Sequence, residues 1–164
     1  MRQSTRTTPL FTSALLIVIA LGSITGPAAA AMQLLKGQTV YVPVYSHIYS
    51  GDREQPFYLA ATVSIRNTDR QHSIVVTAVD YYDSQGKFLK HYLEKDESLG
   101  AMATKRVVVP ESDKSGGSGA KFIVSWRSDQ PVAEPLIESV MISTKTQQGI
   151  SFTSRGRVLN STYP

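Results

Sequence analysis

The sequence predicts an all-β protein that folds as a single β-sandwich of about 7–8 strands after an N-terminal signal peptide. Three observations support this prediction. Short runs rich in Val, Ile, Tyr and Phe recur along the chain and are separated by Gly, Pro, Asp and Ser residues. No stretch after Gln33 carries the apolar repeat of an amphipathic helix. Apolar residues make up 41% of the 164 residues, which excludes a disordered polar chain.

Residues 1–31 have the three parts of a secretory signal peptide. The segment contains two arginines near its start and no acidic residue, and its apolar stretch, Leu10–Ile24, is shorter than the roughly 20 residues of a membrane span. Ala28–Ala31 offers overlapping Ala-x-Ala cleavage sites. We therefore expect cleavage after Ala31, or one residue earlier, and a periplasmic or secreted protein. An uncleaved N-terminal anchor is the alternative interpretation.

The composition excludes several classes of site. The chain contains no cysteine, so disulfide frameworks, thiolate zinc sites and a cysteine nucleophile are all excluded. The formal charge is +4, but without the two arginines of residues 1–31 the chain keeps 15 basic and 13 acidic residues. That small excess gives no support for nucleic-acid binding. We expect no nucleic-acid partner and no membrane span in the mature chain.

The first two strands are predicted from alternation along the chain. Gln38–Ser46 alternates valines with two tyrosines and Pro43. Because proline cannot donate to a ladder, this run is expected on a sheet edge or at a bulge. Phe57–Asn67 follows with an apolar residue at every second position from Leu59 to Ile65, which predicts a strand with one buried face.

The next two strands are predicted to form a hairpin. Ser73–Asp83 carries apolar residues on both faces, so both faces are expected to be covered. Strict alternation assigns Val75, Val79 and Tyr81 to one face, and Ile74, Val76 and Ala78 to the other. The turn Asp83–Lys87 contains Asp and Gly, which support a tight turn, and Lys87–Leu93 is the return strand.

Four further strands complete the predicted domain. They are Thr104–Val109, which Pro110 ends, Lys121–Arg127, Leu136–Thr144 and Ile150–Val158. Trp126 alternates with apolar residues and is expected in the sandwich core, with an exposed platform for a sugar as the alternative. The predicted boundaries are residues 36–159 for the β-sandwich domain and residues 160–164 for a C-terminal tail.

Two resemblances follow from longer stretches. The segment Ala78–Val109, with its Val-Asp-Tyr-Tyr-Asp strand end, Gly-Lys turn and Thr-Lys-Arg-Val-Val-Val strand, resembles part of many bacterial immunoglobulin-like modules. The stretches GQTVYVPVYSHIYSGDREQPFYLAATVSIRNTD, SDKSGGSGAKFIVSW and IESVMISTKTQQGISFTSRG resemble an uncharacterised bacterial family, domain of unknown function three-one-two-four. This second resemblance covers the chain from about Lys36 to Val158 and implies an exported single-domain protein. It implies no activity, ligand or functional residue.

Candidate binding residues gather in the turn-rich stretch Ser46–Pro56 and in the closing strand. Loops on a rigid scaffold often carry function, and exposed tyrosines with charged neighbours suit a binding surface. In the closing strand, a guanidinium among hydroxyl groups is able to hold a carboxylate or phosphate. The candidate residues are Tyr45, His47, Tyr49, Asp52, Arg53 and Arg155. The alternative interpretation is a turn and a strand face that are simply solvated.

Other kinds of site have weaker support. The Gly/Ser-rich stretch Glu111–Ala120 lacks the order of a phosphate loop and is expected to be a flexible inter-strand loop. Gly117-Ser118-Gly119 does not match a hydrolase elbow, so we do not expect an enzyme. The histidines show no paired spacing, and neither a cofactor nor a resident metal is expected.

The leading hypothesis is an exported, non-catalytic module of the bacterial cell envelope that binds a protein or another envelope component. Strand addition at the proline-containing edge is its expected binding mode. One alternative is a small-ligand or metal-binding periplasmic protein that uses His47 with Asp52 or Glu54. An envelope hydrolase is the third hypothesis.

Overall fold

The computed structural model describes residues 33–49, 51–52, 54–143 and 149–164. These residues form twelve β-strands and no helix, so none of the described segments is a helix able to cross a membrane. The strands are β1 (Leu34–Pro43), β2 (His47–Tyr49), β3 (Pro56–Tyr58), β4 (Ala60–Arg66), β5 (Ile74–Tyr82), β6 (Phe88–His91), β7 (Glu97–Leu99), β8 (Thr104–Val109), β9 (Lys121–Ala133), β10 (Leu136–Ser143), β11 (Ile150–Arg155) and β12 (Arg157–Thr162).

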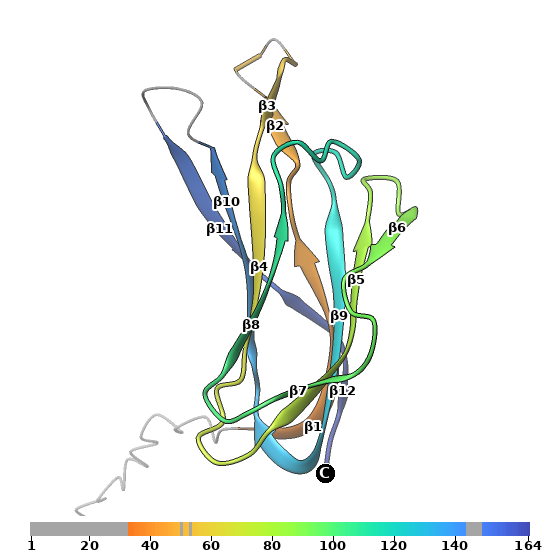
Figure 1. Cartoon of the computed structure of the whole chain (residues 1–164), viewed down its shortest axis with the longest axis vertical. Helices are drawn as coiled ribbons and strands as arrows, with labels where there is room; N and C mark the ends of the chain where they lie inside the picture. Colours follow the sequence, from red (N-terminus) through yellow and green to blue (C-terminus); the bar gives the residue numbers. More distant parts are fainter. Residues whose placement is uncertain (1–32, 50, 53, 144–148) are drawn as a thin grey trace, which may run out of the picture. The chain divides into compact units, whose positions relative to one another are not determined.

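Two antiparallel sheets form the layers of a sandwich (Figure 1). The six-stranded sheet has the order β12-β1-β9-β5-β6, with β7 also paired to β5, and the four-stranded sheet has the order β11-β10-β4-β8. Consecutive long strands such as β4 and β5, or β9 and β10, lie in different sheets, which gives the Greek-key connections of an immunoglobulin-like sandwich. The predicted all-β sandwich is confirmed.

All eight predicted strands are present, and the four additional elements are two unpredicted short strands and two that arise from the division of predicted strands. The short strands β2 and β7 were not predicted, because three residues are too few to show a period. The predicted strand Phe57–Asn67 divides at Leu59 into β3 and β4, and the closing strand divides at Gly156 into β11 and β12. Strand β9 also continues six residues beyond the predicted Arg127, to Ala133.

The core consists of the inward-facing apolar side chains of both sheets. Trp126 on β9 is 2% exposed, which confirms its predicted core position, and its indole N–H donates to Gln38 Oε1 at 3.3 Å. Gln38 is itself buried and donates from Nε2 to Glu134 Oε1 at 3.1 Å. This chain of bonds satisfies two buried polar groups that would otherwise oppose folding.

A bulge in β5 changes which of its residues face the core. The pairing with β9 shifts register between Val76 and Ala78. As a result Ile74 and Val76 before the bulge and Val79 and Tyr81 after it are all buried together. The predicted division of this strand by strict alternation is therefore wrong, because one extra residue reverses the phase of the side chains.

Strand β1 is an interior strand, so of the two predicted positions for this run the sheet edge is wrong, whereas its pairing with β12 does shift register between Thr39 and Val40. It pairs with β12 on one side and with β9 on the other. Pro43 fits because it is the last residue of β1 and lies beyond Tyr41, where the pairing with β12 ends. Because both edges of β1 are paired, a strand of a partner cannot add to it.

Gly156 is the point where the closing strand passes from one sheet to the other. Its N–H donates to Ile137 O at 2.8 Å, and a Cβ at this position would lie 2.7 Å from a methyl carbon of Val40. Residues before it pair with β10 and residues after it pair with β1. Strand β12 continues through Thr162, so the sheet extends into the segment expected as a tail.

Candidate functional site

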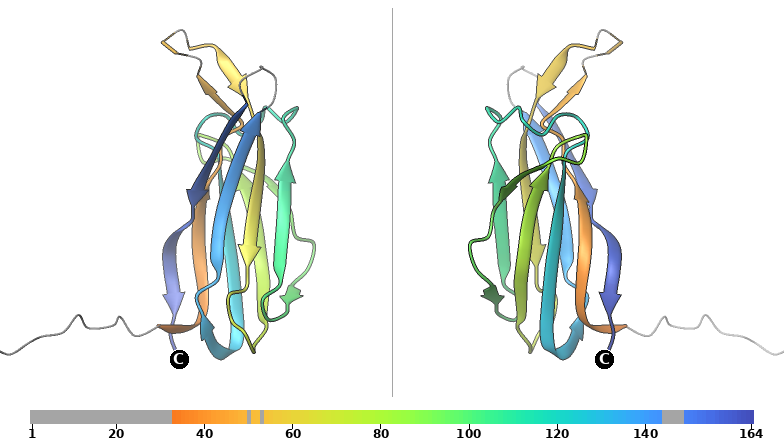
Figure 2. Two further views of the ribbon diagram at one scale, coloured as in Figure 1. Left: turned by 90° about the vertical axis from the view of Figure 1, so that its left-hand side faces the viewer. Right: turned by 90° about the vertical axis from the view of Figure 1, so that its right-hand side faces the viewer.

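The hairpin β2–β3 extends beyond the two sheets at one end of the sandwich (Figure 2). Its pairing places Ile48 opposite Phe57, and both side chains pack against the core. Successive side chains of a strand point to opposite faces, so this apolar pair occupies one face of the hairpin and its neighbours occupy the other. The hairpin is therefore anchored to the core through this apolar face.

The other face of the hairpin carries three rings, which we call the aromatic notch: His47, Tyr49 and Tyr58. The register places Tyr58 directly opposite His47, and Tyr49 lies two residues further along β2. The His47 ring is 5.3 Å from Tyr49 at an interplanar angle of 81°, and 5.9 Å from Tyr58 at 70°. Tyr49 is 50% exposed. His47 and Tyr58 are half-buried, so Tyr49 is the member that is most open to solvent.

The loop between β8 and β9 lies beside the hairpin. The ammonium of Lys114 is 4.5 Å from the centre of the Tyr58 ring, and the N–H of Ser46 donates to Gly117 O at 3.0 Å. The two stretches that the sequence analysis treated separately, 46–56 and 111–120, thus lie side by side. The prediction missed Tyr58 and Lys114, because a two-residue turn at Gly51-Asp52 would have placed Pro56, and not Tyr58, opposite His47.

Hydrogen bonds fix the Gly/Ser-rich loop, which was expected to be flexible. Ser84 donates from its N–H and from Oγ to Gly116 O, at 2.9 and 3.0 Å, and Gly119 N–H donates to Ser84 Oγ at 2.9 Å. Gly116 is buried beneath the Tyr81 phenol, whose pKa is raised by burial. The glycines allow close packing, so this loop is a rigid support for Lys114.

The remaining predicted residues divide into two groups. Tyr45 is half-buried and packs edge-on against Phe152 at 5.6 Å, so it supports the base of the hairpin. Asp52 is exposed in the turn at the hairpin tip, whereas Arg53 lies outside the described residues. Arg155 is exposed on β11, three residues from Phe152 and hence on the opposite face of that strand.

Arg155 therefore does not join the hairpin residues. Its cross-strand neighbour is Glu138, whose carboxylate also pairs with Arg66 at 3.1 Å. These side chains belong to the outer face of the four-stranded sheet. Within the described ranges, no group of three or more His, Asp or Glu side chains is placed to hold a metal ion.

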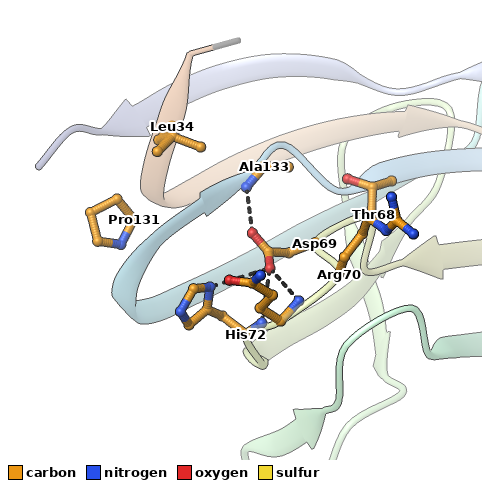
Figure 3. A pocket seen from close by; sticks show the side chains of 8 residues that line it. Leu34, Thr68, Asp69, Arg70, His72, Pro131 and Ala133 are labelled. Atoms are coloured by element: carbon orange, nitrogen blue, oxygen red, sulfur yellow. Dashed lines mark hydrogen bonds and ion pairs between the residues drawn. The ribbon is translucent and has the colours of Figure 1, made fainter.

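A second feature lies at the other end of the sandwich, where the β4–β5 loop meets the end of β9 (Figure 3). An open cavity of about 340 Å³ has Leu34, Pro131 and Ala133 on one side and Asp69 and His72 on the other. The cavity is shallow, and its central carboxylate is already engaged.

Asp69 organises the β4–β5 loop. Its Oδ1 accepts the N–H groups of Gln71 and His72, each at 2.8 Å, and its Oδ2 accepts Ala133 N–H at 3.2 Å. The bond from Gln71 and then the bond from His72 are the main reasons why the pKa of Asp69 falls from 3.8 to about 2. Because these acceptor sites are filled, the role of the Asp69 carboxylate is to stabilise the loop.

The fold and the hairpin together define an antiparallel β-sandwich that carries a projecting aromatic hairpin. The chain belongs to the family described as Protein of unknown function (DUF3124), whose model matches residues 37–159. No curated protein matches the sequence. The crystal structure of Thermotoga maritima 1070 is similar with a TM-score of 0.38 at 8% identity, over 73% of this chain and 92% of that chain.

Proposed function

We propose that this protein is an exported, non-catalytic binding module of the bacterial cell envelope. Its binding surface is the aromatic notch with Lys114, and its partner is a protein or another envelope component. The sequence of residues 1–31, which reads as a signal peptide, supports export to the periplasm or beyond.

One observation carries the proposal: Ile48 and Phe57 anchor the hairpin to the core, while Tyr49 on its other face is 50% exposed. Tyr49 remains half exposed and is not among the described residues that pack against the core. Tyrosines supply large contact area with few rotatable bonds, which is why they dominate the centres of protein interfaces. The hairpin has this composition at the part of the molecule most accessible to a partner.

The test is partner recovery from intact cells that produce the tagged full chain. After cross-linking, Tyr49→Ala is expected to reduce the recovered partner by tenfold or more, about 1.4 kcal/mol, since tyrosine anchors contribute on this scale. Tyr163→Ala is the matched control, because Tyr163 is 56% exposed and lies in the C-terminal segment away from the hairpin. Equal recovery with both variants, at unchanged melting temperatures, would refute the site.

A further inference from the structure

We infer that the aromatic notch binds the cationic side chains of a basic segment in a protein partner. This inference rests on the proposed function and names the chemistry of the partner. Three features support it: the angles between the rings, the position of the Lys114 ammonium, and the balance of charge in the surrounding sequence.

The angles between the rings argue against a flat stacking platform. A sugar ring stacks best on one broad aromatic plane, but the Tyr49 and Tyr58 rings stand at 81° and 70° to the His47 ring. Tyr49 and Tyr58 instead each pack in a T-shaped contact with His47, and Tyr49 remains half exposed. The negative face of an aromatic ring attracts an ammonium group, so the exposed Tyr49 ring offers a surface for one.

The structure already holds an ammonium in this position. Lys114 Nζ lies 4.5 Å from the centre of the Tyr58 ring, within the range of a cation–π contact. Lys114 is exposed, and its loop is fixed by the hydrogen bonds of Gly116 and Gly119 to Ser84. A partner's ammonium beside Tyr49 would meet the same kind of aromatic ring that Lys114 contacts at Tyr58, and Lys114 would be its internal competitor.

The local charge favours the same kind of partner. The stretches 47–58 and 110–120 contain four carboxylates, Asp52, Glu54, Glu111 and Asp113, but only two cations, Arg53 and Lys114. The rest of the chain after residue 31 has the opposite balance, with 13 basic and 9 acidic residues. An acidic end on a basic molecule attracts and orients a basic segment. Because the notch is open on a projection, it suits side chains of a macromolecule better than an enclosed small ligand.

The test uses pentalysine as a probe, with acetylated pentalysine as its uncharged counterpart, titrated into ¹⁵N-labelled protein. We expect shifts of the His47, Tyr49 and Tyr58 amides with pentalysine only. Tyr49→Leu keeps apolar bulk but removes the π face, and it is expected to weaken binding about tenfold, whereas Tyr49→Phe keeps the affinity within about twofold. Lys114→Gln is expected to strengthen binding severalfold, since it removes the competitor.

Specific outcomes overturn the inference. Equal binding of the acetylated peptide, or an unchanged affinity of Tyr49→Leu, shows that positive charge or the aromatic face is not what the notch recognises. If the protein binds phosphatidylcholine vesicles but not pentalysine, the cation belongs to a lipid headgroup. That result overturns the inference of a protein partner. If partner recovery depends on Tyr49 while pentalysine does not bind, this inference fails and the proposed function stands. If neither depends on Tyr49, both fail.

Discussion

The ammonium of Lys114 lies 4.5 Å from the centre of the Tyr58 ring, although Lys114 belongs to the β8–β9 loop and Tyr58 to strand β3. The contact joins the β8–β9 loop to the projecting hairpin, and the bond from Ser46 N–H to Gly117 O joins the same segments at the base. The end of the sandwich therefore behaves as one assembled surface.

A double-mutant cycle measures this contact. Lys114→Met and Tyr58→Leu are expected to show a coupling free energy of about 0.5–1 kcal/mol in urea unfolding, the range of an exposed cation–π pair. Lys114→Met with Tyr163→Leu is the control pair, since Tyr163 is far from Lys114 and should give additive effects. Additivity in the Lys114–Tyr58 cycle would mean that the loop and the hairpin are energetically independent.

Gly116→Ala is expected to destabilise the protein by about 2–4 kcal/mol, because overpacking a closed site forces its neighbours to move. A Cβ at Gly116 would lie 2.0 Å from the Tyr81 hydroxyl and 2.7 Å from the Ala120 Cβ. Gly100→Ala is the matched control, since nothing lies within 4 Å of its Cβ position. Thermal and urea unfolding check the prediction, and similar stabilities for the two variants would contradict it.

The low pKa of Asp69 predicts an acid dependence of stability. The pKa is about 2 in the folded protein and about 3.8 in the unfolded chain, so the contribution of Asp69 is complete above pH 3.8 and is lost as the pH falls towards 2. Asp69→Asn should therefore flatten the unfolding free energy between these pH values. Urea unfolding at a series of pH values measures the slope, and identical slopes for both proteins would show that the bonds to Asp69 contribute nothing.

Substitution of Asn67, a buried polar residue, is expected to lower the free energy of unfolding strongly. It is 2% exposed, and its amide donates to the carbonyl oxygens of His72, Leu99 and Gly100 at 2.8–3.2 Å. Asn67→Ala is expected to cost about 2–3 kcal/mol, because buried acceptors lose their partner. Thr68→Val removes only an exposed bond and should cost less than about 1 kcal/mol. Urea unfolding measures both losses of unfolding free energy, and equal losses for the two variants would contradict the expected effect of burial.

The sequence was sufficient to predict the long strands, because alternation and turn residues are local signals. Trp126 was assigned to the core by the same reasoning. The position of β1 was mispredicted because Pro43 lies at the strand end, where a missing N–H costs nothing. The phase of β5 depends on a bulge between Val76 and Ala78, which only the pairing with β9 determines.

The candidate site was predicted only in part. His47 and Tyr49 were found because they are close in sequence, and the hairpin brings them together on one face. Lys114 could not be found, since its contact with Tyr58 depends on how two distant loops pack. Arg155 was grouped with the hairpin by residue chemistry alone, and its strand face separates it from Tyr45.

Site-resolved cross-linking in intact cells tests the central claim most directly. A photoreactive residue replaces either Asp52, at the hairpin tip, or Met102, which is 65% exposed in the β7–β8 connection at the other end of the sandwich. The account predicts one saturable adduct from position 52, lost with Tyr49→Ala and competed by unlabelled protein, and no such adduct from position 102. Adducts of equal yield from both positions, or an adduct from position 102 alone, would contradict the hairpin as the binding surface.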